Sequence, residues 1–169
     1  KSPFYGEGGG QVGDRGCIKT ANAVFEVTGT TKTGDGVILH HGHIVEGEDI
    51  AVGEKAVLSV DREKRNATKR NHTAAHLLQA ALRKVLGTHV EQAGQLVDEN
   101  IVRFDFVHFS AMTSEEIEKV EKMVNDEILA AVCVDVSEMP IAEAKKLDGE
   151  VIAFLHYPPI SLTETCHEI

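Results

Sequence analysis

The sequence predicts an α+β protein in which a small β-rich part precedes a part that combines helices and strands. Residues 1–61 contain short β-branched or alternating runs separated by glycines. From residue 62 onward, apolar residues at helical spacing alternate with strand-like runs. We therefore predict two domains, residues 1–61 and 62–169, with about seven to eight strands and about three helices in total.

In the first part, strands are predicted at residues 24–28, 36–39 and 55–60. Three consecutive glycines, residues 8–10, stand between Glu7 and Gln11. Such a run lets the backbone approach a ligand closely, so its N–H groups could hold a phosphate or a carbonyl oxygen. The spacing taken alone favours the alternative, a tight turn of a small barrel. The run lacks the Lys-Ser/Thr of a P-loop and the spacing of a dinucleotide-binding fingerprint. We expect a small, glycine-rich, β-barrel-like subdomain.

The second part begins with a long helix that carries two histidines. Ala75, Leu78, Leu82 and Val85 recur at three- and four-residue spacing, and Gly87 has the position of a C-terminal cap. A second helix is predicted after Thr113, which can cap it, and Glu116 completes a capping box, with the apolar stripe running to about residue 131. Further strands are predicted at residues 101–106 and 133–136, and a short helix at 141–147.

His72 and His76 are the most informative residues of the chain. Two imidazoles four residues apart on a helix face the same way, and zinc is bound by such a pair without strain in the backbone. Thr73 stands where a zinc metalloprotease has its glutamate base, so protease chemistry is disfavoured. Two chance histidines on a polar helix face remain the alternative for the pair taken alone.

Composition indicates a soluble globular protein, with 42% hydrophobic and 26% charged residues. No apolar stretch approaches the roughly 20 residues that span a bilayer, and the N-terminus has no signal-peptide core. Three cysteines at wide spacing are compatible with reduced thiols, so we expect a cytoplasmic protein. The chain begins without methionine, which suggests a piece of a longer polypeptide.

The net charge of −10 argues against a surface built as a whole to attract nucleic acid. One basic run nevertheless leads into the histidine helix: Arg62, Lys64, Arg65, Lys69 and Arg70. This run is either a solvated helix face or a local phosphate contact. In the second case, another module of a longer protein would supply much of the affinity.

Six further histidines are interpreted as structural. His41 and His43 lie on one face of a predicted strand and His40 on the other, which does not favour a three-histidine metal site. His89, His108 and His156 lie at the edges of predicted elements and are read as surface or turn histidines.

Four motifs occur in a characteristic order: Phe-Tyr-Gly-Glu-Gly-Gly-Gly-Gln at residues 4–11, Asn-His-Thr-Ala-Ala-His-Leu-Leu at 71–78, His-Val-Glu-Gln-Ala-Gly at 89–94 and Arg-Phe-Asp-Phe at 103–106. Over nearly the whole chain this order resembles the editing domain of bacterial alanyl-tRNA synthetase. The resemblance implies an α/β editing core with an antiparallel sheet. It also implies a zinc-dependent hydrolase that removes serine or glycine from mischarged tRNA(Ala).

The resemblance implies one Zn²⁺, held by His72, His76 and a Cys-x-x-x-His motif near the end of the domain. In this chain Cys166 fits that motif, but His167 follows it directly, so its role as fourth ligand is provisional. The shortened spacer is explained either by loop residues absent from the sequence or by a true deletion that impairs the site.

By the same resemblance, Gln92 hydrogen bonds to the substrate, and Glu7 and Gln11 line the cavity. The metal would either activate a water or anchor the substrate. The expected partners are the tRNA(Ala) acceptor end and the remaining domains of a parent synthetase, whose ATP-binding catalytic portion would precede this part. Two alternatives stay open: a catalytically impaired tRNA-binding module with an incomplete metal site, and a free-standing alanyl-tRNA editing protein.

Overall fold

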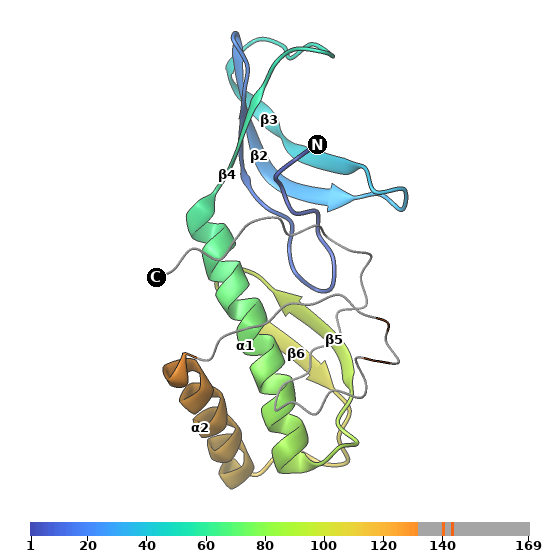
Figure 1. Cartoon of the computed structure of the whole chain (residues 1–169), viewed down its shortest axis with the longest axis vertical. Coiled ribbons are helices and arrows are strands. Elements are labelled where there is room, and N and C mark those ends of the chain that lie inside the picture. The colour runs from blue at the N-terminus through green and yellow to red at the C-terminus, as the bar shows by residue number, and fades with distance from the viewer. Residues whose placement is uncertain (132–139, 141–142, 144–169) are drawn as a thin grey trace.

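A four-stranded antiparallel sheet forms one end of the molecule (Figure 1). In the computed structural model, which describes residues 1–131, 140 and 143, its strands are β1 (Gly16–Lys19), β2 (Ala23–Lys32), β3 (Ile38–Gly47) and β4 (Val57–Val60). Their order is β3-β2-β1-β4, and every neighbouring pair is antiparallel. The chain is therefore α+β with antiparallel sheets, as predicted.

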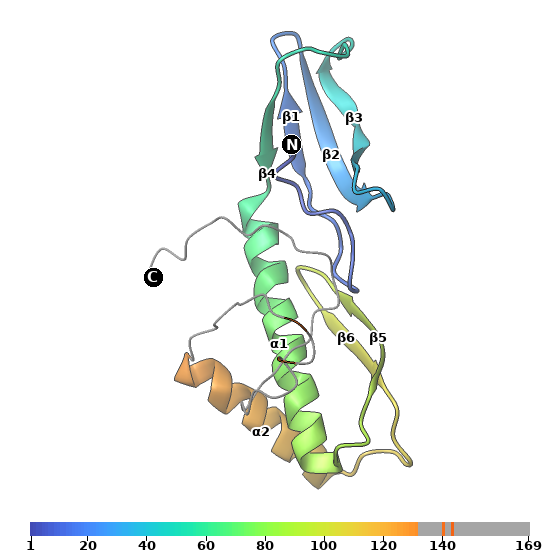
Figure 2. The ribbon, with the colours of Figure 1, turned by 45° about the vertical axis from the view of Figure 1, so that its right-hand side comes forward.

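The predicted barrel-like shape of this part is wrong, because the sheet is open (Figure 2). Within the described residues, β3 and β4 are its two edges and do not pair with each other. A closed barrel needs its first and last strands to hydrogen bond around an interior wide enough for side chains. Four strands, of which β1 and β4 have four residues each, do not enclose such an interior.

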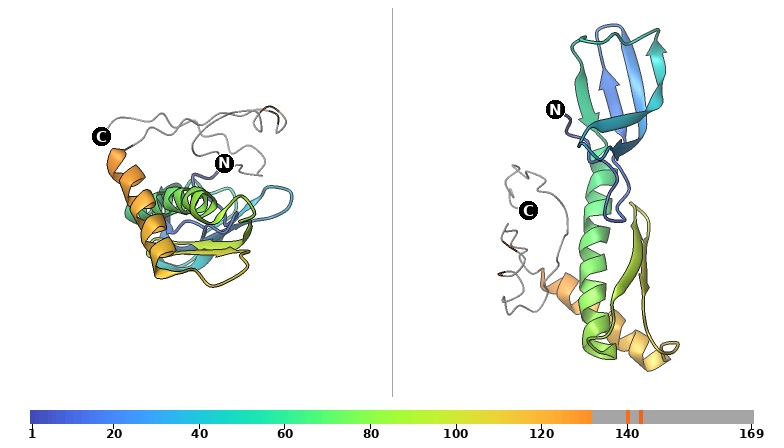
Figure 3. Two further views of the ribbon diagram at one scale, coloured as in Figure 1. Left: turned by 90° about the horizontal axis from the view of Figure 1, so that it is seen from below. Right: turned by 90° about the vertical axis from the view of Figure 1, so that its right-hand side faces the viewer.

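The long helix α1 (Arg62–Leu86) follows β4 almost directly and runs away from the sheet (Figure 3). Its 25 residues correspond to a length of about 37 Å. Asp61 caps its start by accepting a hydrogen bond from the backbone N–H of Lys64 at 3.1 Å. Gly87 caps its end, as the sequence predicts.

Beyond the sheet, α1 packs against a hairpin and a second helix (Figure 2). The hairpin consists of β5 (Gln92–Val97) and β6 (Val102–Phe106), and the helix is α2 (Ser114–Ala130). Thr113 and Glu116 form the predicted capping box. The buried centre of this part comprises Ala81, Leu82, Val90 and Val120.

An apolar groove of about 400 Å³ lies between α1, α2 and β6. Ala74 and Leu78 of α1 line it together with Phe104 and Phe106 of β6. On a helix, residues 74 and 78 point away from residues 72 and 76, so the groove is separate from the histidine pair.

The sequence pattern did not predict β1 and β5, because β1 is very short and β5 contains two glutamines and a glycine. β3 is longer than expected, since it continues through the polar residues 40–43. The strand predicted at 133–136 and, apart from Glu143, the helix predicted at 141–147 lie outside the described residues. The division at residues 61 and 62 stays a prediction. Neither described helix is long and apolar enough to cross a membrane.

Candidate metal centre

His72 and His76 lie side by side on α1, one helical turn apart. Their ring centroids are 5.0 Å apart and their planes differ by 17°, so the rings stack. Both residues are about half-buried. The helix thus presents two imidazoles from adjacent turns, which is the arrangement that the spacing predicts.

Gln11 fixes the orientation of the first ring. The Nδ1 of His72 lies 2.7 Å from Oε1 of Gln11, and Gln11 is only 8% exposed. With the amide oxygen as acceptor, Nδ1 carries the proton and donates the hydrogen bond. The Nε2 of His72 then keeps its lone pair. A metal-binding histidine commonly donates its other ring N–H to an oxygen in this way.

The Nε2 of His72 is buried and has no hydrogen-bond partner within the described part of the chain. A buried polar atom without a partner is unusual, and a bound ligand, water or ion commonly accounts for it. Burial lowers the pKa of His72. The pKa of His76 is also lowered, mainly by burial and to a smaller degree by the charge of His72. Both rings are therefore neutral near pH 7, which is the form that binds zinc. These observations fit a metal site.

Two donors alone do not make a structural zinc site, which takes four. Among residues 1–131, 140 and 143, no group of three or more His, Cys, Asp or Glu side chains lies close enough to hold a metal ion. The predicted ligands Cys166 and His167 lie outside the described residues.

The glycine run forms a turn that presents Gln11 to α1. Gly8 and Gln11 exchange backbone hydrogen bonds of 3.0 and 3.1 Å, and Val97 of β5 donates to the carbonyl of Gly10 at 2.7 Å. Gly10 has φ +78°, and a Cβ there would stand 2.6 Å from the carbonyl oxygen of Gln95. Glycine is therefore required at position 10 both by conformation and by space.

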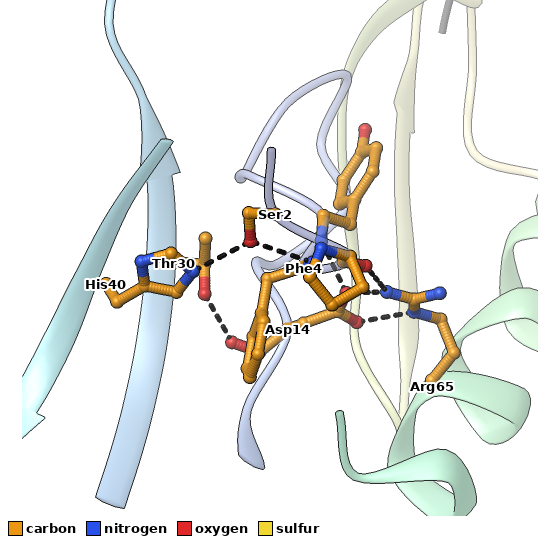
Figure 4. Close-up of polar contacts among 8 residues, drawn as sticks. Ser2, Phe4, Asp14, Thr30, His40 and Arg65 are labelled. Atoms are coloured by element: carbon orange, nitrogen blue, oxygen red, sulfur yellow. Dashed lines mark hydrogen bonds and ion pairs between the residues drawn. The ribbon is translucent and has the colours of Figure 1, made fainter. Parts of the chain in front are cut away.

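A second network joins the N-terminal segment to α1 (Figure 4). Arg65 donates from Nε to Oδ1 of Asp14 at 2.7 Å and from Nη2 to Oδ2 of Asp14 and to the carbonyl of Pro3. Asp14 is 7% exposed, and its backbone carbonyl accepts a hydrogen bond from Thr30 Oγ1 at 2.8 Å. Sequence reasoning missed this pair, because nothing in the sequence connects residues so far apart.

The pair also changes the interpretation of the basic run. Arg65 is engaged by Asp14, and Lys64 lies 3.9 Å from a carboxylate oxygen of Glu99. Arg62, Lys69 and Arg70 are exposed. Only these three retain the expected choice between a solvated face and a phosphate contact.

Glu7 and Gln92, the other two predicted site residues, are both exposed. The backbone N–H of Glu7 donates to Thr30, and Gln92 begins β5 opposite Phe106. None of the contacts described for these two residues reaches the histidine pair, so their predicted roles stay predictions. Gln11 is the predicted residue that the fold brings to the histidines.

The three histidines of β3 have separate partners. His40 lies 2.9 Å from Ser2 Oγ (Figure 4), His41 lies 2.7 Å from Thr31 Oγ1, and His43 lies 3.5 Å from Glu26. They do not converge on one point, which agrees with the structural role expected from the strand pattern.

Comparison with known proteins adds the family context. Residues 1–64 match the family described as tRNA synthetases class II (A). The alanine–tRNA ligase of Acetivibrio thermocellus is 51% identical over 152 residues, covering 90% of this chain and 17% of that protein. The alanine–tRNA ligase of Staphylococcus saprophyticus is 44% identical over 175 residues, covering 98% of this chain and 20% of the relative. The chain thus spans about a fifth of the length of these relatives.

Proposed function

The chain belongs to the alanine–tRNA ligase family, as a segment of its members, and from this premise we propose that it hydrolyses the aminoacyl ester of tRNA(Ala) mischarged with serine or glycine. In this proposal it is the editing part of an aminoacyl-tRNA synthetase and acts in the cytoplasm. Its partners are the acceptor end of tRNA(Ala) and the remaining domains of the ligase.

The observation that carries the proposal is the way in which the two ring nitrogens of His72 are held. Its Nδ1 is held by Gln11 at 2.7 Å, and its Nε2 is buried without a partner in the described residues. A helix that buries such an atom beside a second neutral imidazole has a reason to do so if a metal ion binds there. A metal ion bound at this place would support a chemical role in addition to tRNA binding.

We propose that His72, His76 and Cys166 hold one Zn²⁺, with His167 as the provisional fourth ligand. When bound, the ion supplies Lewis acidity toward a water or an anchor for the substrate. Gln11 keeps His72 in the tautomer whose Nε2 is free to bind. Glu7 and Gln92 would contact the aminoacyl adenosine, Gln92 by a hydrogen bond.

The need for such a site follows from the size of the amino acid. The aminoacylation site of a synthetase that fits alanine cannot exclude glycine, which is smaller. It also discriminates weakly against serine, which adds one hydroxyl. A second site that hydrolyses the wrong esters supplies the missing selectivity. This is the chemistry proposed for the present segment.

The experiment measures zinc content and hydrolysis of seryl-tRNA(Ala) on one preparation of the chain. We expect about one zinc per chain and measurable deacylation. The variant His76→Ala should lose both. His41→Ala serves as the matched control, because His41 is an exposed histidine whose described side-chain contact is Thr31.

Two results would redirect the proposal. A folded chain that contains no zinc and does not hydrolyse the ester would indicate a tRNA-binding module with an incomplete metal site. Hydrolysis that survives His76→Ala would place the chemistry elsewhere in the chain.

A further inference from the structure

Three aromatic side chains lie together at the end of the molecule farthest from the four-stranded sheet, where Phe109 stacks on His89 and His89 hydrogen bonds to His108. The rings of His89 and His108 are 5.1 Å apart at an angle of 20°, and His89 Nε2 lies 2.9 Å from His108 Nδ1. The ring of Phe109 lies 4.5 Å from His89 at an angle of 26°. We name these residues the aromatic stack.

The outer ring of the aromatic stack is open. Phe109 is 84% exposed, although a phenylalanine normally buries most of its surface. Its neighbour Val107 is also exposed, at 59%. A flat ring that is held in place on one side and open to solvent is what proteins use to bind an unpaired base by stacking.

The surrounding charges suit a nucleic-acid strand. Arg83 and Lys84 lie in the last turn of α1 and are exposed. Arg83 Nη1 donates a hydrogen bond to the carbonyl of Val90 at 3.1 Å. Val90 follows His89 in the sequence, so this bond holds the guanidinium near the aromatic stack. Of the acidic groups nearby, Glu116 is engaged with the N–H of Thr113 in the capping box, and Glu91 is exposed.

Arg83 links this end of α1 to the histidine pair. Arg83 follows His76 by seven residues, so both occupy one face of α1, about 10 Å apart along the helix axis. An RNA strand whose end lies at the histidine pair and which runs along this face of α1 toward Gly87 would reach the aromatic stack.

Resting on the proposed function, we propose that the aromatic stack binds an unpaired nucleotide of the single-stranded acceptor end of tRNA, upstream of the ester. Phe109 supplies the stacking face, and Arg83 and Lys84 contact the adjacent phosphates. Nothing covalent occurs at this site, since its role is to hold the strand.

The test measures binding of an uncharged RNA hairpin with the acceptor stem of tRNA(Ala) and a single-stranded tail, beside the same hairpin without the tail. We expect the wild-type chain to prefer the tailed RNA. Phe109→Ala should weaken tailed-RNA binding by about tenfold, the loss typical of one base stacked on an aromatic ring. Phe109→Trp should retain the preference.

Phe109→Leu separates stacking from general apolar contact. Leucine keeps apolar surface but has no flat ring, so we expect it to behave like Phe109→Ala. Leu129→Ala, at an 82% exposed position of α2, is the control for loss of exposed apolar surface. Equal affinity of wild type and Phe109→Ala for the tailed RNA would overturn the proposal, as would full affinity in Phe109→Leu, which would mean that general apolar contact and not stacking holds the tail.

Failure here is distinguishable from failure of the proposed function. A chain that hydrolyses seryl-tRNA(Ala) but shows no preference for the tail loses only the aromatic-stack proposal. A chain that prefers the tail through Phe109 but has no metal-dependent hydrolysis keeps the binding site and loses the hydrolase.

Discussion

The side chain of Gln11 accepts a hydrogen bond from Nδ1 of His72 at 2.7 Å, across a sequence separation of 61 residues. Gln11 belongs to the glycine-rich turn of the first part, and His72 belongs to the helix of the second. The orientation of the His72 ring on α1 therefore depends on a turn that precedes every strand of the four-stranded sheet. This dependence can be tested whatever the identity of the other metal ligands.

Replacing Gln11 should weaken zinc binding. Gln11→Ala removes the acceptor of Nδ1–H and frees the His72 ring to rotate and change tautomer. Loss of such a partner commonly lowers metal affinity by about 10- to 100-fold. Competition with a chelator of known affinity measures the effect. Gln11→Glu keeps an acceptor at this position and should retain tight binding, whereas equal affinity in all three proteins would contradict the role given to Gln11.

Gly10→Ala should reduce both stability and deacylation. An alanine there is strained at φ +78°, and its Cβ would stand 2.6 Å from the carbonyl oxygen of Gln95. Gly53→Ala is the matched control, because Gly53 has φ +88° but nothing within 4 Å of its Cβ position. The strained conformation should lower the free energy of unfolding by about 1–2 kcal/mol in both variants.

The collision should add a further loss in Gly10→Ala alone and should displace Gln11. Urea unfolding and the rate of seryl-tRNA(Ala) hydrolysis measure the two effects. If the two variants lose the same stability and neither loses activity, the turn does not position Gln11 in the way described.

The sequence predicted best what depends on neighbouring residues. The caps of both helices, Gly87 and Thr113 with Glu116, follow from side chains that hydrogen bond or turn the backbone locally. The spacing of His72 and His76 likewise determines their common face. The contact of Gln11 with His72 and the pair of Asp14 with Arg65 depend on how distant segments meet, so no periodicity predicts them.

The openness of the sheet has the same origin. Alternating residues predict that a segment is a strand, but which strands become edges depends on the pairing of β3 and β4, which local patterns do not encode. The basic run shows the cost of this limit. Its composition left a solvated helix face and a phosphate contact both open, and only the fold reveals that Arg65 is held by Asp14.

Asp14→Ala should destabilise the chain strongly. Removing the carboxylate leaves Arg65 and the backbone N–H of Tyr5 without the acceptor that they share. The Arg65 side chain is 27% exposed, so water compensates in part, and we expect a loss of about 2–3 kcal/mol in the free energy of unfolding, below the range for a fully buried pair. Asp126→Ala, which breaks the exposed pair with Lys122, should cost less than about 0.5 kcal/mol. Similar losses in the two variants would show that the Asp14 pair is no more important than a surface pair.

The capping box of α2 should make stability depend on pH in the acid range. The hydrogen bond from the backbone N–H of Thr113, at 2.8 Å, lowers the pKa of Glu116. A carboxylate whose pKa is lower in the folded state than in the unfolded state stabilises the fold above its unfolded pKa, and this contribution is lost as the pH falls through the folded pKa. Glu116→Gln keeps an acceptor for the N–H but carries no charge. Its urea midpoint should therefore lie below that of the wild type at pH 7, and the difference should shrink as the pH is lowered past the pKa of Glu116 in the folded chain. A difference between the two midpoints that is constant from neutral to acid pH would mean that the ionised carboxylate of Glu116 does not contribute to the cap.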